Sequence, residues 1–247
     1  NSDNVARVMS EALSIATMGQ PGPVHVDDPR AARDQHRLRS GRRDREPRRD
    51  VHVHAARHAA VAHAEKELGG FDIIVNNAGI AQIQPIADVT PEEFDKIIRV
   101  NVAGVLWGIQ AAAKKFKERK QKGKIISASS IAGHEGFPLL GLYAATKFAV
   151  RALTQAAAKE FASDGITVNA YCPGVVGTDM WVEIDRRMAE ITGAEIGASY
   201  EKFVGGIALG RAQTPEDVAA FVSYLAGPDS DYMTGQAPLI DGGLVYR

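Results

Sequence analysis

The sequence predicts an α/β fold: a single Rossmann-like domain built on a doubly wound parallel sheet. From residue 59 onward, short apolar runs typical of strands alternate with longer segments of helical character. This alternation indicates a parallel sheet with helices on both faces. Capping and turn residues separate the segments, and a length of 247 residues suits one domain. The ligand crevice of such a fold lies at the carboxyl ends of the strands.

Four apolar runs are the expected strands. They are Asp72–Val75, Lys124–Ser127, a run that starts with Ile166–Val168 and ends with Asn169–Tyr171, and Ala237–Ile240. Each is short and rich in aliphatic residues, as strands buried on both faces of a sheet are.

The expected helices have recognisable starts and stops. Thr90 and Thr214 each precede a proline and acidic residues, which is the pattern of an N-cap and a first helical turn. Gly69 and Gly165 are natural helix stops. The predicted helices are Ala59–Leu68, a helix from Pro91 through Asn101 towards Lys115, Tyr143–Ala162 and Pro215–Leu225.

Composition narrows the classes of function. The net charge of -1 gives no overall reason to expect nucleic acid or an anionic membrane as a partner. The chain has no apolar run of about 18 residues, and residues 1–4 lack the features of a signal peptide. The lone Cys172 excludes an intrachain disulfide and fits a reducing compartment. We therefore expect a cytoplasmic protein with no membrane partner and no metal site.

Residues 1–58 differ in composition from the rest of the chain. Between Arg30 and Asp50 lie nine arginines, four acidic residues and one large aliphatic residue, Leu38. Such a stretch buries too little apolar surface to offset chain entropy, so it is interpreted as a solvated segment. Nucleic-acid binding is an alternative, although no aromatic residue is interleaved for base stacking. Out-of-frame translation of GC-rich DNA is a third interpretation.

Tyr143 and Lys147 are the first candidates for catalysis. A spacing of four places both side chains on one face of a helix. A phenol titrates near pH 10, and a neighbouring ammonium is expected to lower the phenol pKa, which suits proton transfer near neutral pH. Ser130 follows the Lys124–Ser127 strand, so its hydroxyl is expected at the crevice, where it can hold a substrate carbonyl.

Two other strand ends carry small or polar residues. Asn76–Gly79 follow one strand, and Pro173–Gly174 follow another, with Thr178 able to hydrogen-bond an amide. Small residues let a flat ligand lie close to the backbone. A plain turn would explain each of these motifs alone, but not their combination.

Taken together, these motifs closely resemble the short-chain dehydrogenase/reductase family. In order they are Asn76–Gly79, Asn101, Ser130, Tyr143 with Lys147, Pro173–Gly174 and Asp241–Gly243. The resemblance covers residues 59–247, which we interpret as the catalytic domain, whereas residues 1–58 form an atypical segment. It implies a nicotinamide cofactor, NAD, whose hydride chemistry the protein positions.

The resemblance also implies a role for individual residues. Tyr143 would be the general acid/base, and Lys147 would lower its pKa and hold the nicotinamide ribose. Ser130 would orient the carbonyl, and Asn101 would sustain a water relay to Lys147. The implied cofactor-binding residues are Asp50, Val51, Asn77, Ala78, Gly79, Tyr143, Lys147, Pro173, Gly174, Val176 and Thr178.

Within the family, the chain is most similar to the acetoin/diacetyl reductases, also called 2,3-butanediol dehydrogenases. The segments that carry this similarity are Gly136–Pro138, Lys147–Gln155, Tyr171–Gly174, Met180–Asp185 and Asp231–Gln236. The similarity implies substrate contacts from Ser130, Ile131, Phe137, Tyr143 and Trp181. The apolar residues at 131 and 137 resemble the L-type, which forms (S)-acetoin, and an apolar wall suits the methyl groups of a four-carbon substrate.

Residues 1–58 depart from the family pattern. The family begins with a strand and a Gly-rich turn that lets the backbone approach a pyrophosphate. Gly19–Gly22 is the nearest candidate, but Pro21 removes a backbone donor and the third glycine is absent. The N-terminal βαβ portion is therefore expected to be atypical or missing. Asp50–Val51 stands at the distance before Asn76 that the family's adenine contact requires.

Two functions remain open at this point. In the first, the chain is an active NAD-dependent oxidoreductase that interconverts diacetyl, acetoin and 2,3-butanediol, or acts on another small ketone or alcohol. In the second, it is a reductase-like protein whose cofactor binding is impaired and which serves as an assembly subunit. Because family members are commonly tetramers, the resemblance implies a homotetramer, with the helix of Tyr143 between subunits.

Overall fold

The computed structural model describes residues 61–247, which belong to two compact units. One contains Asp72–Arg247, and Val61–Phe71 belong to the other. Residues 61–68 are helical and are followed by Gly69, whose backbone is left-handed with φ 73°. The expected helix Ala59–Leu68 is thus confirmed over its described residues, with Gly69 as its stop. The interpretations of Arg30–Asp50, the missing Gly-rich turn and Asp50–Val51 lie outside the described residues.

Four parallel strands form the sheet of the larger unit, in the order β1-β2-β3-β4. The strands are β1 (Ile73–Asn76), β2 (Gly123–Ala128), β3 (Ile166–Pro173) and β4 (Leu239–Ile240). Ile125 pairs with Ile74 on one side and with Val168 on the other. All four expected strands are present. β3 is longer than the apolar run Ile166–Val168 suggests, because its pairing with β2 and β4 continues through polar and proline residues.

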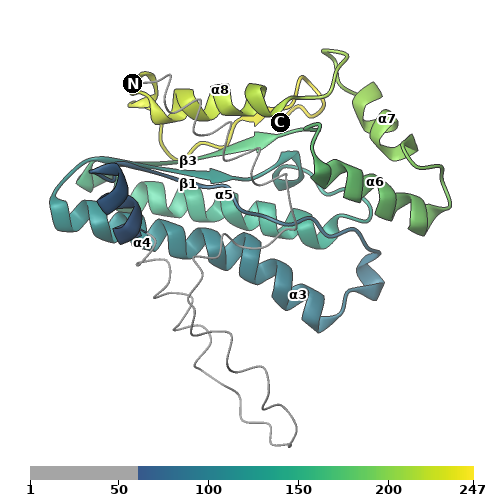
Figure 1. Ribbon diagram of the computed structural model, residues 1–247, viewed down its shortest axis with the longest axis horizontal. Helices are drawn as coiled ribbons and strands as arrows, with labels where there is room; N and C mark the ends of the chain where they lie inside the picture. Colours follow the sequence, from purple (N-terminus) through teal and green to yellow (C-terminus); the bar gives the residue numbers. More distant parts are fainter. Residues whose placement is uncertain (1–60) are drawn as a thin grey trace, which may run out of the picture. The chain divides into compact units, whose positions relative to one another are not determined.

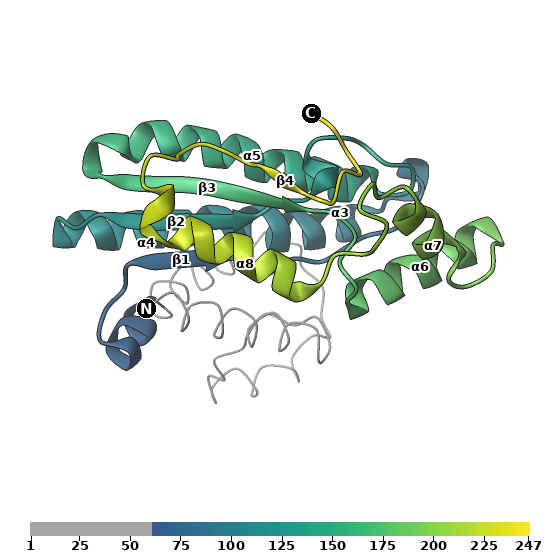
Figure 2. The ribbon, with the colours of Figure 1, turned by 90° about the horizontal axis from the view of Figure 1, so that it is seen from above.

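Helices cover both faces of this sheet, as Figures 1 and 2 show: α4 and α5 lie on one face and α8 lies on the other. The helices are α3 (Pro91–Ile98), α4 (Gly104–Arg119), α5 (Gly141–Phe161), α6 (Asp179–Thr192), α7 (Ala198–Gly205) and α8 (Pro215–Ala226). Short 3-10 turns span Ile86–Asp88, Ile131–Gly133, Ala162–Asp164 and Pro228–Ser230. A parallel sheet with helices on both faces confirms the predicted α/β class.

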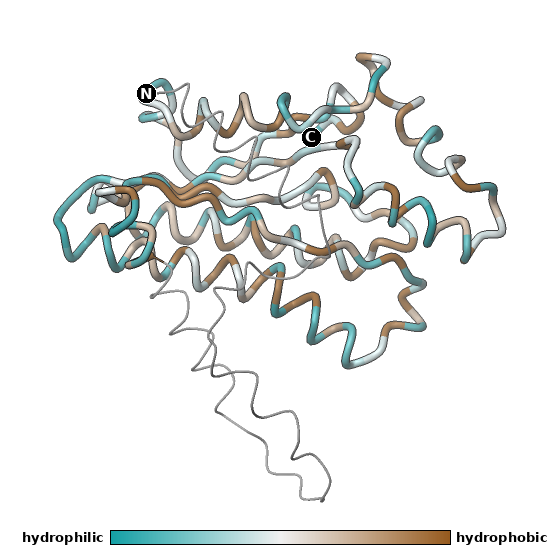
Figure 3. The backbone as a smooth tube through the Cα atoms, viewed as in Figure 1, coloured by the Kyte–Doolittle hydropathy of each residue, from teal (hydrophilic) through white to brown (hydrophobic). Residues whose placement is uncertain are grey.

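The core lies between the sheet and its helices. Ile125 and Val168 on the strands and Val150 on α5 are 0% exposed. Figure 3 shows hydrophobic residues gathered along the strands, whereas the outer turns of the helices alternate in hydropathy. This distribution is the one that a doubly covered parallel sheet requires.

Two helix starts follow the sequence prediction in detail. The Thr90 hydroxyl accepts from the backbone N–H of Glu93 at 3.3 Å, and the Glu93 carboxylate accepts from the backbone N–H of Thr90 at 3.0 Å. Thr214 and Asp217 make the same reciprocal pair at the start of α8. Each capping box satisfies two backbone donors that a helix leaves unbonded.

The structure differs from the predicted helices in two places. The helix predicted from Pro91 towards Lys115 is interrupted by a π-helical turn at Arg99–Ala103 and continues to Arg119. No helix was expected over α6 or α7, whose residues the sequence pattern left unassigned. The described residues include no helix that is long and apolar enough to cross a membrane.

Candidate active site

The candidate residues gather where the parallel strands end. β1, β2 and β3 are neighbours in one direction, so the segments that follow them leave the sheet at the same edge. Asn77–Ile80 follow β1, Ser129–Gly133 follow β2, and Gly174–Thr178 follow β3. The first turns of α5 bring Tyr143 and Lys147 to the segment that follows β2.

Lys147 is buried, with 5% of its surface exposed. Its Nζ lies 2.9 Å from the carbonyl oxygen of Ala128 and 5.5 Å from the centroid of the Tyr143 ring. Burial lowers the pKa of Lys147 to about 8 because a desolvated ammonium is disfavoured. One of its three N–H donors is used by Ala128, which leaves two for a ligand.

Tyr143 is half-buried as a whole, and its hydroxyl is desolvated. Desolvation raises the pKa of Tyr143, and a hydrogen bond with Ser130 acts in the opposite direction but does not overcome it. The structure therefore differs from the expectation that Lys147 brings the phenol pKa down towards neutrality. The raised pKa keeps the Tyr143 hydroxyl protonated at neutral pH.

Ser130 stands at the point where β2 gives way to the turn Ile131–Gly133. Its backbone is extended, and its hydroxyl accepts from the backbone N–H of Ala132 at 3.1 Å. The turn packs tightly on α5: a Cβ on Gly133 would lie 2.4 Å from the Ser129 hydroxyl and 3.0 Å from the Lys147 carbonyl oxygen. This close packing fixes Ser130 relative to the helix that carries Tyr143.

Asn101 lies in the π-helical turn and is 1% exposed. Its Oδ1 accepts from the backbone N–H of Ile80 at 2.9 Å, and its Nδ2 donates to the Ile80 carbonyl oxygen at 2.9 Å and to Thr146 Oγ1 at 3.1 Å. Thr146 in turn donates to the Tyr143 carbonyl oxygen at 2.6 Å. Asn101 therefore joins the segment after β1 to the helix of Tyr143, and its amide hydrogens are engaged by protein groups.

Thr146 was not singled out by the sequence. It is 0% exposed and lies within the Tyr143–Lys147 spacing, so its hydroxyl is held between Asn101 and α5. Its position on the helix, three residues after Tyr143, was the available signal.

The segment after β1 approaches the reactive side chains with its backbone. A Cβ on Gly79 would lie 3.4 Å from both Asn101 Oδ1 and Lys147 Nζ. Asn77 is held by the hydroxyl of Tyr171, which donates to its Oδ1 at 2.6 Å. Ala78 stands between Asn77 and Gly79 in the chain and is exposed. The small residues 77–79 thus leave a backbone surface beside Lys147.

The segment after β3 forms another part of the edge. A Cβ on Gly174 would lie 2.8 Å from the Cβ of Asp241, so only glycine fits there without a shift. The backbone N–H of Gly174 donates to Gln213 Oε1 at 3.2 Å. Thr178 precedes α6, and its hydroxyl donates to the Val176 carbonyl oxygen at 3.4 Å. Pro173 is the last residue of β3.

The structure brings together only some of the residues expected to contact the substrate. Ile131 directly follows Ser130 in the chain and is 5% exposed. Phe137 and Trp181 come from different segments, and both pack against Phe203 of α7, with ring centroids 5.9 Å and 5.2 Å away. Phe203 was not predicted, because nothing in its local sequence marks it. An apolar cluster that includes Tyr143 contains all three rings.

The described residues that suit a nicotinamide cofactor are those beside Lys147. Two free N–H donors on Lys147, the close backbone approach at Gly79 and the anchored Asn77 fit the ribose and the adjoining part of a dinucleotide. Asp50 and Val51, which the resemblance places at the adenine, lie outside the described residues. Residues 61–247 include no cluster of three or more His, Cys, Asp or Glu side chains that could hold a metal ion.

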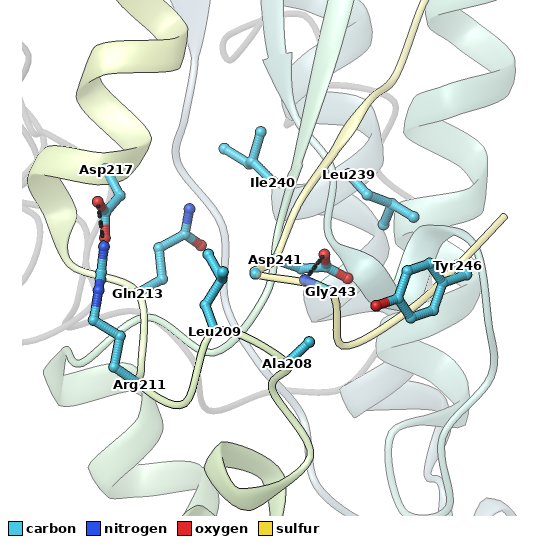
Figure 4. A pocket seen from close by; sticks show the side chains of 11 residues that line it. Ala208, Leu209, Arg211, Gln213, Asp217, Leu239, Ile240, Asp241, Gly243 and Tyr246 are labelled. Atoms are coloured by element: carbon cyan, nitrogen blue, oxygen red, sulfur yellow. Dashed lines mark hydrogen bonds and ion pairs between the residues drawn. The ribbon is translucent and has the colours of Figure 1, made fainter.

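A separate surface hollow of about 530 Å³ lies beside β4 (Figure 4). Its charged groups are satisfied by neighbours: Arg211 pairs with Asp217, and the Asp241 carboxylate accepts from the backbone N–H groups of Gly243 and Val245. None of the catalytic or substrate-binding residues predicted from the sequence lines it. The residues predicted to be catalytic lie instead where β1, β2 and β3 end.

Comparisons with known proteins show which family the chain resembles. A family model described as enoyl-(acyl carrier protein) reductase, of the short-chain alcohol dehydrogenase type, matches residues 26–245. The chain is 55% identical over 189 residues to L-2,3-butanediol dehydrogenase of Corynebacterium glutamicum, which covers 76% of this chain and 73% of that protein. It is 53% identical over 199 residues to a diacetyl reductase, (S)-acetoin forming, of Staphylococcus epidermidis, covering 80% and 77%.

Solved structures give the same grouping. A gluconate 5-dehydrogenase from Burkholderia cenocepacia in complex with NADP and tartrate is 32% identical, with a TM-score of 0.68 over 79% of this chain and 72% of that one. A short-chain type dehydrogenase/reductase from Mycobacterium marinum is 34% identical, with a TM-score of 0.68 over 78% and 72%.

Proposed function

This chain belongs to the short-chain dehydrogenase/reductase family, and from that premise we propose that it uses NAD to interconvert diacetyl, acetoin and 2,3-butanediol, with Tyr143 as general acid/base. It is an oxidoreductase of alcohols and ketones. The observation that carries the proposal is the convergence of Ser130, Tyr143 and Lys147 at the strand-end edge.

Tyr143 supplies the proton in the reductive direction. Its raised pKa keeps the hydroxyl protonated at neutral pH, so it donates to the carbonyl oxygen of a bound ketone. Ser130 is close enough to Tyr143 to oppose the rise of its pKa, which supports the proposal that the Ser130 hydroxyl holds the same carbonyl oxygen. When bound, the nicotinamide supplies or accepts the hydride, and the protein contributes position and charge.

Lys147 serves this step through its remaining donors. Its ammonium holds the ribose hydroxyls of the cofactor, and its pKa of about 8 lets it exchange protons near neutral pH. Asn101 supports it by holding Ile80 and Thr146, which keeps the segment after β1 against Lys147. Asn77, Ala78 and Gly79 would line the adenosine side of the cofactor, and Val176 and Thr178 would fix its carboxamide. Pro173 and Gly174 would be further cofactor contacts.

The substrate is a small vicinal ketone or alcohol. The proposal is supported by the apolar cluster that Phe137 and Trp181 share with Tyr143, because apolar walls suit methyl groups rather than charged or long substituents. Ile131 would be a further apolar substrate contact. We assign the L-type outcome, with (S)-acetoin as the product of diacetyl reduction, in agreement with the names of the relatives. Chiral chromatography of the product tests this assignment, and (R)-acetoin alone would contradict it.

NAD is proposed from the resemblance to the acetoin/diacetyl reductases, while the structural neighbour in complex with NADP makes the choice of cofactor an experiment. Titration of the protein with NADH and with NADPH, followed by cofactor fluorescence, measures the Kd for each cofactor. Saturable NADH binding tighter than millimolar is expected. The absence of such binding would favour the alternative, a reductase-like subunit with impaired cofactor binding.

The assembly we propose is a homotetramer with α5 and α4 between subunits. Phe148 on α5 is 43% exposed, and Ala156 is an exposed small residue on the same helix that permits close packing of helices. Sedimentation equilibrium measures the mass, and a monomer at micromolar concentration would contradict the proposal. The predicted cytoplasmic location stays a prediction.

Activity itself is tested by following NADH oxidation with diacetyl and with acetoin, and reduction of NAD with gluconate as a control substrate. Saturable turnover of the first two, and none with gluconate, is expected. Turnover with gluconate and none with diacetyl would contradict the proposed substrate, although the chain would still be an oxidoreductase of the same family.

A further inference from the structure

The helix α7 is tied to α6 through one buried carboxylate. Asp185, on α6, is 4% exposed. Its Oδ2 accepts from the backbone N–H of Gly197 at 2.5 Å, and its Oδ1 accepts from the backbone N–H of Tyr200 at 3.0 Å. Both oxygens therefore serve the start of α7.

This arrangement has a physical reason. A buried carboxylate is unfavourable unless its oxygens accept hydrogen bonds. The first turn of a helix has unbonded N–H groups and a partial positive charge, so it is a suitable partner. The connection between α6 and α7 contains Gly193 and Gly197, whose φ angles are 74° and 97°. Because these glycines give the connection conformational freedom, Asp185 is what fixes the start of α7.

The aromatic face of α7 reaches the candidate substrate walls. The Phe203 ring centroid lies 5.2 Å from that of Trp181 and 5.9 Å from that of Phe137. Tyr200 packs against Trp181 with ring centroids 6.0 Å apart. All these pairs are edge-to-face, an arrangement that stabilises aromatic contacts beyond their buried area. Phe203 and Tyr143 belong to the same apolar cluster.

We propose that Asp185 is a positioning residue that fixes α7, and that Phe203, held in this way against Trp181 and Phe137, sets the largest acyl group that the substrate site accepts. The inference rests on the proposed function for the identity of the substrate, a vicinal diketone. It concerns residues of α6 and α7 that lie outside the Ser130–Tyr143–Lys147 group.

The size limit is tested with a series of diketones. The ratio of kcat/KM for 2,3-hexanedione to that for diacetyl is measured in the wild type, Phe203→Ala and Asp185→Ala. One methylene in an apolar site changes kcat/KM by about 10-fold to 200-fold, so Phe203→Ala is expected to raise the ratio by at least about 10-fold. Asp185→Ala is expected to raise the same ratio and the KM for diacetyl, with the Kd for NADH within about twofold of the wild type.

Two variants serve as controls. Glu190→Gln removes an exposed carboxylate of the same helix, which pairs with Arg186 and Arg187, and should leave the ratio unchanged. Asp185→Asn keeps the shape of the side chain but replaces one acceptor by a donor, so it gives a second reading if Asp185→Ala does not fold. A ratio in Phe203→Ala and in both Asp185 variants equal to that of the wild type would overturn the proposal.

A measurement without substrate separates this proposal from the proposed function. The chain has 2 tryptophans, so Trp107→Phe leaves Trp181 as the sole indole. In that background, Asp185→Asn is expected to increase quenching of Trp181 fluorescence by acrylamide, and Glu190→Gln is not. Unchanged quenching in Asp185→Asn would refute the positioning role. If the wild type does not reduce diacetyl at all, the proposed function fails, but the quenching result still decides the role of Asp185.

Discussion

Replacement of Lys147 by methionine is expected to change how stability depends on pH. Methionine has a similar length and an apolar, flexible side chain. Burial holds the pKa of Lys147 at about 8, compared with 10.5 for an ordinary lysine. At about 1.4 kcal/mol per pH unit, this difference makes the charged lysine unfavourable in the folded state by roughly 3 kcal/mol at neutral pH.

The sign follows from proton binding. Between pH 8 and 10.5 the unfolded chain binds the Lys147 proton and the folded chain has released it, so the lysine makes the wild-type free energy of unfolding rise with pH in this window. Below pH 8 the penalty is fully present. Lys147→Met has no such group, and it loses only the bond to Ala128 O, which costs about 1–3 kcal/mol at every pH.

Urea denaturation of both proteins at a series of pH values from neutral to alkaline measures the effect. The free energy of unfolding of the wild type, relative to that of Lys147→Met, is expected to increase by most of roughly 3 kcal/mol across the window. Groups that titrate in both proteins cancel in the difference. A difference that stays constant with pH would refute the conclusion that Lys147 is buried with a lowered pKa.

Three further predictions concern single side chains. Ser130→Ala is expected to lower kcat with diacetyl by about 100-fold while the Kd for NADH stays within about twofold, because it removes the hydroxyl proposed to hold the carbonyl. An unchanged kcat would contradict that role. Thr146→Val removes the hydroxyl between Asn101 and the Tyr143 carbonyl oxygen, so its free energy of unfolding, measured by urea denaturation, is expected to fall by about 1–2 kcal/mol. Thr146→Ser keeps the hydroxyl and should keep most of the wild-type free energy of unfolding. Gly108→Ala would place a Cβ 2.0 Å from Asn76 Oδ1, so a loss of about 1–3 kcal/mol in thermal unfolding is expected, and wild-type stability would show that the α4–β1 packing is looser.

The parts of the fold that depend on local pattern were predictable. Thr90 and Thr214 marked their helix starts because capping uses residues within three positions of each other. The strands were recognisable as apolar runs, although β3 continued beyond its apolar start. The π-helical turn at Arg99–Ala103 was not recognisable, because Asn101 adopts it through bonds to Ile80 and Thr146 that come from other segments.

The sequence was enough to predict several residues of the site, but not the contacts that join those residues to other segments. Ser130, Tyr143 and Lys147 were singled out by spacing, and the structure brings them together. Phe203 and Asp185 were missed because their importance arises from contacts between α6, α7 and the segment after β2, which no local periodicity encodes. The expected lowering of the Tyr143 pKa was wrong because a spacing of four says nothing about desolvation.

The central claim is that Tyr143 delivers the proton to a diketone bound beside a nicotinamide cofactor. The most direct test compares wild type and Tyr143→Phe for NADH oxidation in the presence of diacetyl, with NADH binding measured by fluorescence on the same samples. The account predicts saturable turnover by the wild type, a loss of at least about 1,000-fold in kcat for Tyr143→Phe, and a Kd for NADH within about threefold of the wild type. Turnover by Tyr143→Phe at a rate close to that of the wild type would contradict it.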